Sequence, residues 1–531
     1  MENVSGLASW RIAPPPIPES EIKEEYSTDV LVVGLGNAGT PATRAAAEAG
    51  ASVIAIEKME KKKYRVWGED IGHINSDFLA GKGVPRVDPI EFFNEWMRRS
   101  GNRANPKLVM QFCQNCGEMF DWFIEPLNKE QIDSIRVEYW PLGKRFAGQI
   151  SGQKFWAGTA EFPGGLFYKG NFNLLRAILA NQEMAKDKGA KLHFGIDAQQ
   201  LVMSDNNVVG VIARDSKGQY LRYKANKGVI LAAGDFAGNK EMRDDLLLDI
   251  SDLFDDGEHF TSFGRDGRGI QMGVWAGGRL EARPIAVMRG NHQTLHGVIA
   301  TFGALWVDEA GKRYCNEGFG DPVFAGFPGA QEKRGTNTIV FDSSVLDDLQ
   351  SGPPAHTSFF INDNSQERFL KNSMAEARKM GAKGYAADRG RSHLYAADTL
   401  EELADYVGFN GIARRNFLAT IKRYNRFCAT GRDEDFGKDV QLLNAVDTPP
   451  YYAEPKEGSD IGNMMVTCGG LLTNEYQNVL NQKRDPIPGL YATGNCCGRR
   501  FGLQYSTPIA GVSIGIAMTL GREAGKIVAN L

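Results

Sequence analysis

The sequence contains little cysteine. Only seven cysteines occur in 531 residues, and such an odd, scattered set does not form the disulfide framework of a small secreted domain. Cys113 and Cys116 are followed by Gly117 and not by histidine, which excludes a c-type haem attachment at this pair. No run of cysteines has the spacing of an iron–sulfur cluster site, and we predict no metal site. The cysteine content indicates a reducing compartment, so we expect a cytoplasmic protein.

Excess charge of one sign and long apolar runs are also missing. The 61 basic and 65 acidic residues leave a net charge of −4, and no basic run predicts a nucleic-acid surface. The uncharged stretch at residues 508–521 is too short to span a bilayer. The first 20 residues lack the basic and apolar regions of a signal peptide. We therefore predict no nucleic-acid partner and no membrane insertion.

Glycine is the residue in excess, with 61 copies that gather in short motifs. The first motif follows an apolar stretch at residues 29–33 and has the spacing Gly34-x-Gly36-x-x-Gly39. Gly34 permits a tight turn, Gly36 lets a pyrophosphate approach the backbone, and Gly39 lets a helix pack close to the strand. Glu57 ends the next apolar stretch and can accept hydrogen bonds from a ribose hydroxyl. This segment predicts a dinucleotide-binding site.

Two later segments have the same apolar and glycine-rich character. Residues 227–238 read KGVILAAGDFAG, and residues 486–495 read PIPGLYATGN. The second is followed by PIAGVSIGIAMTLGREAGK, which we expect to form a buried helix with small residues at its start. A chain that returns so late to strands of its first domain contains an interrupted domain.

Together these segments resemble the flavoprotein family of fumarate reductase and the succinate dehydrogenase flavoprotein subunit, which includes the 3-ketosteroid dehydrogenases and bacterial ene-reductases. Residues 264–267 (GRDG) resemble the family's GDG region, and residues 311–317 (GKRYCNE) resemble its cap-domain motif. The resemblance implies an α/β fold, in which a Rossmann-like FAD-binding domain is interrupted by an α+β capping domain for the substrate. The expected parts are an extended N-terminal arm (1–27), the FAD-binding domain (28–276 and 437–531) and the cap (277–436).

The resemblance also implies FAD as the cofactor. The helix that begins near Ser513 would point its N-terminus at the flavin, where a helix dipole stabilises the negative charge of the reduced form. The segment after Glu57 lacks the family's usual form for covalent attachment, so we expect non-covalent FAD. The residues expected to contact it are Gly34, Gly36, Asn37, Ala38, Gly39, Glu57, Lys58, Gly68, Asp70, Ile71, Ala233, Gly234, Asp266, Gly494, Asn495, Ser513 and Ile514.

The residues that clamp a dicarboxylate in fumarate reductases are largely absent. Reduction of an activated C=C bond needs a hydride from flavin N5, a proton donor, and donors that stabilise the carbonyl or carboxylate. No arginine lies near Leu346, where the family's proton-donating arginine is expected, and Val466 stands near the Gly469-Gly470 pair where a histidine is usual. The late clamp arginine would fall near Tyr505. We therefore predict a substrate other than fumarate, with fewer carboxylates and larger or more apolar.

The C-terminal QYSTPIAGVSIG instead resembles the ending of the ketosteroid dehydrogenases, where a tyrosine and a glycine N–H bind the keto oxygen. Gly511 matches that glycine, and Tyr505 lies two residues from the position of that tyrosine. Arg313 and Glu317 of the cap motif could form a structural ion pair or a proton relay. The catalytic candidates are Tyr505, His292, Arg313 and Glu317, and the substrate-binding candidates are Arg289, Arg499, Arg500 and Gly511.

The sequence thus predicts an FAD-dependent oxidoreductase that reduces, or in reverse forms, a C=C bond beside a carbonyl or carboxyl group. Its expected partners are a small unsaturated substrate and an external electron donor or acceptor, because no haem or iron–sulfur motif occurs in the chain. Two alternatives remain open. One is an oxidase or dehydrogenase of C–N bonds, as in L-aspartate oxidase, and the other is a non-catalytic flavin subunit that only transfers electrons.

Overall fold

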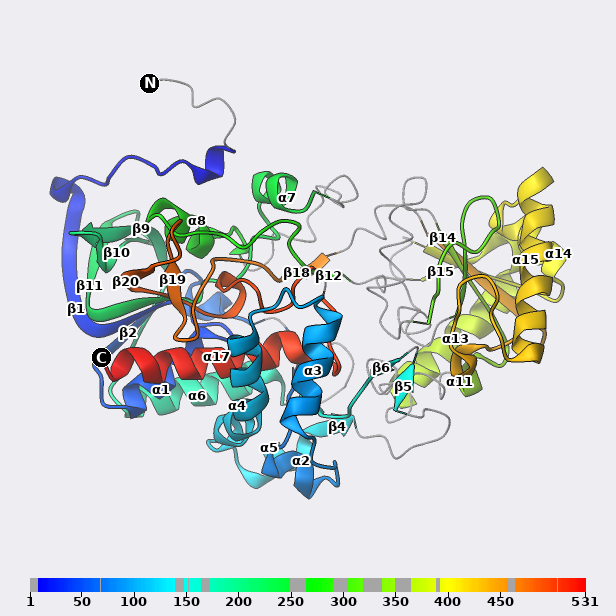
Figure 1. Cartoon of the computed structure of the whole chain (residues 1–531), viewed down its shortest axis with the longest axis horizontal. Helices are drawn as coiled ribbons and strands as arrows, with labels where there is room; N and C mark the ends of the chain where they lie inside the picture. Colours follow the sequence, from blue (N-terminus) through cyan, green and yellow to red (C-terminus); the bar gives the residue numbers. More distant parts are fainter. Residues whose placement is uncertain are drawn as a thin grey trace.

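A mixed β-sheet organises the larger part of the molecule (Figure 1). The structure is a computed structural model, and it describes residues 8–66, 68–138, 148–150, 152–163, 172–248, 264–289, 304–318, 337–348, 364–387, 392–456, 464–503 and 505–531. Strands β19, β20, β11, β1, β2 and β8 follow one another across the sheet, β10 pairs with β11 and β9, and the pairs β20–β11, β11–β1, β1–β2 and β2–β8 are parallel. The strands are β1 (Ile22–Val33), β2 (Val53–Glu57), β8 (Lys191–Phe194), β9 (Ile196–Ser204), β10 (Asn207–Asp215), β11 (Tyr220–Leu231), β19 (Asn478–Leu480) and β20 (Pro486–Ala492).

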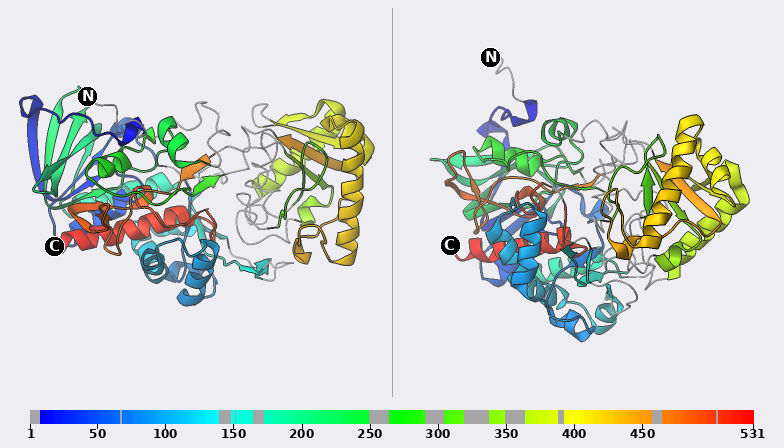
Figure 2. Two further views of the ribbon diagram at one scale, coloured as in Figure 1. Left: turned by 45° about the horizontal axis from the view of Figure 1, so that its top comes forward. Right: turned by 45° about the vertical axis from the view of Figure 1, so that its right-hand side comes forward.

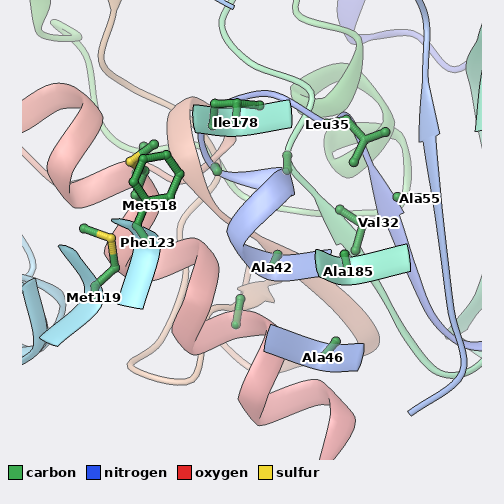
Figure 3. Packing of buried hydrophobic residues seen from close by; sticks show 14 of the residues in the cluster. Val32, Leu35, Ala42, Ala46, Ala55, Met119, Phe123, Ile178, Ala185 and Met518 are labelled. Carbon is green, nitrogen blue, oxygen red and sulfur yellow. The ribbon is translucent and has the colours of Figure 1, made fainter. Parts of the chain in front are cut away.

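Four helices cover one face of this sheet. Figure 3 shows Val32 of β1 and Ala55 of β2 to the right of Ala42 of α1, in a cluster that also holds Phe123 and Met518. The central parallel segments of the sheet, residues 30–33, 53–57 and 228–231, are buried on both faces, which is why their apolar residues run continuously and do not alternate. The helices are α1 (Gly39–Glu48), α4 (Pro106–Ile124), α6 (Leu174–Asp187) and α17 (Val512–Ala529).

Helices α1 and α17 pack closely although they come from opposite ends of the chain. A Cβ atom at Gly521 would lie 2.2 Å from the Ala38 carbonyl oxygen, and one at Gly525 would lie 2.2 Å from that of Ala42. Only glycine fits at so short a distance, because real Cβ atoms do not approach backbone so closely. The small residues that the sequence places in these two helices thus bring the C-terminal segment onto the first nucleotide-binding unit.

The opposite face of the sheet carries α7 (Lys240–Leu246), α8 (Arg268–Trp275) and the N-terminal segment. Trp10, in the short turn η1 (Ser9–Arg11), is buried in this cluster, and its indole N–H donates to Asp245 at 3.0 Å. The N-terminal arm was expected to reach residue 27. It ends before Ile22, because β1 begins there and pairs with β11. The short turns η2 and η3 are Glu19–Glu21 and Lys61–Lys63.

Smaller elements accompany the main sheet. Strands β3, β7 and β4 form one sheet, β12 pairs with β18, and β5 pairs with β6. These elements are β3 (Asp70–Gly72), β4 (Arg136–Glu138), β5 (Gln149–Ile150), β6 (Gln153–Lys154), β7 (Thr159–Glu161), β12 (Val287–Arg289), β18 (Met464–Thr467), η12 (Gly494–Cys496), α2 (Asp77–Gly81), α3 (Pro89–Arg99) and α5 (Lys129–Ser134). Within the described ranges, no helix is both long enough and apolar enough to cross a bilayer.

The cap is a second body, and both views of Figure 2 show its sheet and helices at the far end of the molecule from β1. Its sheet runs β13–β14–β17–β16–β15, with α13 packed in one apolar cluster and α14 and α15 in another. Strand β17 lies beyond Phe436, so the cap sheet extends past the expected domain boundary. The elements are β13 (Leu305–Val307), β14 (Asn337–Asp342), β15 (Tyr385–Ala387), β16 (Ser392–Ala397), β17 (Tyr451–Lys456), α11 (Val345–Asp348), α13 (Asn364–Met380), α14 (Leu400–Val407), α15 (Gly411–Thr430), η9 (Gly381–Lys383) and η11 (Val440–Leu442).

Candidate functional site

A long cavity lies at the carboxyl ends of the parallel strands. Its volume is about 250 Å³, and it opens to solvent. Its walls include the residues that follow three neighbouring strands, namely Gly34 after β1, Lys58 after β2 and Ala233 after β11. Gly494, which comes soon after β20, closes the same end. In open α/β sheets, ligands bind in the crevice outside these carboxyl ends.

The glycines after β1 build one end of the cavity by steric necessity. Gly34 has φ = 99°, and a Cβ there would lie 2.5 Å from the Ala232 carbonyl oxygen. A Cβ at Gly39 would lie 1.8 Å from the Gly34 carbonyl oxygen, so this glycine permits α1 to pack on β1. Gly36 differs, because no atom lies within 4 Å of its Cβ position although it lines the cavity. Its missing side chain leaves the room that a ligand can fill.

The same end offers a buried carboxylate. Glu57 accepts hydrogen bonds from Leu35 N and Met59 N, each at 2.9 Å, and burial raises the pKa of this carboxyl group. Each oxygen can accept a further hydrogen bond. Beside it, Lys58 Nζ lies 2.7 Å from Asp266 Oδ2. A carboxylate that ends the second strand can bind the hydroxyls of a ribose.

The start of α17 forms the other end of the cavity. Gly511 precedes the helix with φ = 74°, and its carbonyl accepts from Gly72 N at 2.9 Å. Ser513 N donates to the hydroxyl of Tyr505 at 3.1 Å. Gly511, Ser513 and Ile514 all line the cavity, so the positive end of this 18-residue helix lies against it.

An apolar wall stands at this second end, and sequence analysis did not predict it. Met288 of β12 and Val466 of β18 pair across the two strands, and both line the cavity together with Tyr505. Tyr505 is 2% exposed and belongs to the apolar cluster beneath the wall. The antiparallel ribbon that places Met288 beside Val466 joins residues far apart in the sequence.

An ion pair next to the wall, between the half-buried Arg265 and the buried Asp235, was also missed. Arg265 donates two hydrogen bonds to Asp235, at 2.8 and 2.7 Å, and Asp235 also accepts from Thr467 N at 2.8 Å. Arg265 and Asp235 both line the cavity. The carboxylate thus neutralises the guanidinium and ties it to the end of β18.

These features match what FAD requires of a protein. The chain offers glycine backbone and a helix N-terminus for phosphates, a carboxylate for ribose, and a second helix N-terminus for the flavin ring. Residues 29–513 match the family described as FAD binding domain. The chain belongs to this family. FAD is therefore confirmed as the cofactor, and the cavity is the candidate site for it.

Comparison with known proteins agrees with this assignment. The chain is 25% identical to the vinyl phenol reductase of Lactiplantibacillus plantarum over 95% of this chain and 97% of that protein. It is also 25% identical to a fumarate reductase (cytochrome) of Shewanella frigidimarina, over 95% of this chain and 77% of that protein. The solved structure of the 3-ketosteroid-Δ4-(5α)-dehydrogenase of Rhodococcus jostii RHA1 superposes with a TM-score of 0.69 at 20% identity, covering 96% of this chain and 98% of that one. The predicted fold class is confirmed.

Most residues expected to contact FAD line the cavity. Two do not: Gly39 packs α1 against the Gly34 carbonyl, and Ile71, the middle residue of β3, is fully buried in the core. His73 is also buried in the core, where it stacks on Phe120, so it is not positioned for covalent attachment. The expected contacts that line the cavity are Gly34, Gly36, Asn37, Ala38, Glu57, Lys58, Gly68, Asp70, Ala233, Gly234, Asp266, Gly494, Asn495, Ser513 and Ile514.

Among the catalytic candidates, Tyr505 lines the cavity and the cap pair does not. Arg313 donates two hydrogen bonds to Glu317 and two to Asp433, at 2.7–2.9 Å, and all three side chains are buried. Burial opposes the charge on each group, but the two carboxylates raise the pKa of the Arg313 guanidinium, and Arg313 lowers the pKa of Asp433 to about 2. Saturated pairing of this kind stabilises the cap and supplies no mobile proton, so we do not propose catalysis by Arg313 or Glu317.

Among the substrate-binding candidates, too, some residues line the cavity and others do not. Gly511 lines the cavity, whereas Arg499 and Arg500 do not. Arg500 is fully buried behind Asn495, because the loops after β18 and η12 close over it. Arg289 is the last residue of β12. His292 lies outside the described residues.

Proposed function

We propose that this flavoprotein reduces a C=C bond conjugated to a carbonyl group in an uncharged, largely apolar substrate. The observation that carries the proposal is the wall at the α17 end of the FAD site, made by Met288, Val466 and Tyr505. A site for a dicarboxylate needs cationic donors that are free to bind it. Arg265, which is tied to the end of β18 through Asp235, is neutralised by the Asp235 carboxylate.

Bound FAD supplies the hydride in this chemistry. The chain contributes donors for the electron-rich oxygen that develops when the hydride arrives. Tyr505 is a phenol whose hydroxyl already meets the first turn of α17, and the helix N-terminus adds positive potential at the same place. We assign Tyr505 and the Gly511 N–H to the substrate oxygen, and Tyr505 is our candidate proton donor.

The relatives support C=C reduction more firmly than they support a substrate. One is a vinyl phenol reductase, one is a fumarate reductase, and the similar structure is that of a 3-ketosteroid dehydrogenase. The apolar wall favours the neutral members of this set. It also disfavours an amino-acid oxidase, since that substrate carries a carboxylate. We propose that electrons arrive from an external donor.

Anaerobic reoxidation tests this function. Chemically reduced holoprotein is mixed with neutral enones, a vinyl phenol, monocarboxylate enoates and fumarate, and the flavin absorbance is followed. We expect rapid reoxidation by a neutral compound with the saturated product found by mass spectrometry. Reoxidation by fumarate alone would refute the substrate class, and no reoxidation by any C=C compound would refute the reaction.

A further inference from the structure

A buried pair of charges lies directly behind the FAD site, and neither member lines it. Arg500 is 0% exposed and Glu281 is 7% exposed. Glu281 accepts from Gly470 N at 3.0 Å and from Arg499 N at 2.9 Å. Its carboxylate therefore joins the loop after β18 to the loop after η12.

Arg500 joins the same two loops from the other side. Its Nε donates to the Cys497 carbonyl at 2.9 Å, and Nη2 donates to the Cys468 carbonyl at 3.2 Å. The same Nη2 donates to Asn495 Oδ1 at 2.7 Å. Each acceptor is neutral, so the guanidinium charge is not cancelled by a hydrogen-bonded carboxylate. Its Nη1 has no hydrogen-bond partner among the described residues.

A buried cation with an unused donor costs folding free energy, which argues that Arg500 serves more than stability. A guanidinium has donors only. It therefore fixes the side-chain amide of Asn495 with the oxygen turned toward Arg500 and the NH₂ group turned the other way. Asn495 lines the FAD site, so its NH₂ group becomes a donor on the cofactor's side.

We infer that Arg500 is a positioning residue for FAD: it orients the Asn495 amide as a hydrogen-bond donor and holds a positive charge behind that contact. This role replaces substrate binding, which the sequence had suggested for Arg500. It rests on the FAD site and not on the identity of the substrate. Glu281 supports it by holding the two loops whose carbonyls receive the guanidinium.

A double-mutant cycle on FAD affinity tests the inference. We expect Arg500→Met to weaken FAD binding by the apoprotein about tenfold, and Asn495→Ala to do the same. The double variant should lose no more than about threefold beyond either single variant, because coupled residues do not add. Dissociation constants from flavin fluorescence give the answer. Additive losses, or an unchanged affinity in Arg500→Met, would overturn the inference.

A second readout separates positioning from a merely structural role. The flavin midpoint potential should become more negative in Arg500→Met, because the lost charge no longer favours the reduced flavin, and Arg500→Lys should restore most of it. Arg499→Met is the matched control and should leave affinity and potential unchanged. A lower melting temperature with wild-type potential and affinity would assign Arg500 to stability alone. If Arg500→Met does not fold, the neutral polar variant Arg500→Gln takes its place in the cycle with Asn495→Ala, under the same criteria.

Discussion

The two ends of the FAD site are built by different means. At the first end, glycine is required at Gly34 and Gly39, because an added Cβ would lie 2.5 Å and 1.8 Å from backbone oxygens, and Glu57 is the last residue of β2. At the second end, Met288, Val466 and Tyr505 come from three separate segments. The first end obeys local rules of turn and helix, whereas the second depends on how distant loops meet. We expect substitutions at the first end to affect cofactor binding and those at the second to affect chemistry and substrate choice.

The largest expected effect is at Tyr505. Tyr505→Phe removes the hydroxyl that meets Ser513 N, and kcat/KM for a neutral enone should fall roughly 100-fold, as when a general acid or an oxyanion donor is lost. FAD affinity should change less than threefold. Tyr223→Phe is the control, since Tyr223 is a buried tyrosine whose hydroxyl bonds His193 outside the cavity. Equal kcat/KM values for Tyr505→Phe and wild type would remove Tyr505 from the active site.

The next effect tests the first end. Gly36→Ala places a methyl group where no protein atom lies within 4 Å, so the apoprotein should keep its melting temperature. FAD affinity should drop at least tenfold, because the methyl group enters space that the pyrophosphate needs. Gly81→Ala, which also meets nothing within 4 Å but lies outside the cavity, is the control. If FAD titration gives the same dissociation constant for both variants, Gly36 does not line the phosphate site.

Charge at the wall should change substrate preference. Val466→Arg introduces a cation beside Met288, and the ratio of kcat/KM for a monocarboxylate enoate to that for a neutral enone should rise about tenfold, since charge-assisted hydrogen bonds favour the carboxylate. Met288→Leu conserves volume and should leave the ratio unchanged. Steady-state kinetics with both compounds measures it. A ratio that stays constant in Val466→Arg places the substrate elsewhere.

The smallest effect concerns pH and the charge pair behind the site. Burial raises the pKa of Glu281 to about 7, against the opposing influence of its two backbone donors and of Arg500 and Arg499. A folded-state pKa above the unfolded value means that this group's contribution to stability is full below about pH 4.5 and is lost as pH rises to about 7. Between pH 5 and pH 8, the free energy of unfolding should therefore fall less for Glu281→Gln than for wild type. The expected difference is on the order of 1 kcal/mol. Urea unfolding at both pH values measures the difference, and parallel curves would contradict the raised pKa.

Sequence analysis predicted the first end well. Gly34, Gly36 and Glu57 belong to a motif with fixed spacing, so local geometry fixes their positions in the sheet. Gly494, Asn495 and the start of α17 were also located, because each follows a strand or begins a helix. Short-range rules of this kind can be read along the chain.

The second end could not be predicted from spacing alone. Met288 and Val466 lie side by side only because β12 pairs with β18. Asp235 accepts a hydrogen bond from Arg265, which belongs to a separate turn. Arg500 was expected to face the substrate because it follows Gly494-Asn495. Arg500 is instead buried, where it donates hydrogen bonds to the carbonyls of Cys468 and Cys497, which belong to two different loops. An arginine between such loops looks the same in the sequence whether it faces a ligand or supports a wall.

The rates at which a neutral enone and fumarate reoxidise the flavin depend on the character of this wall. Anaerobic stopped-flow mixing of the reduced holoprotein with a neutral enone and, separately, with fumarate gives two second-order rate constants for flavin reoxidation. A site walled by Met288, Val466 and Tyr505 predicts a rate constant for the neutral enone at least 100 times that for fumarate. A rate constant for fumarate equal to or above that for the enone would contradict the account.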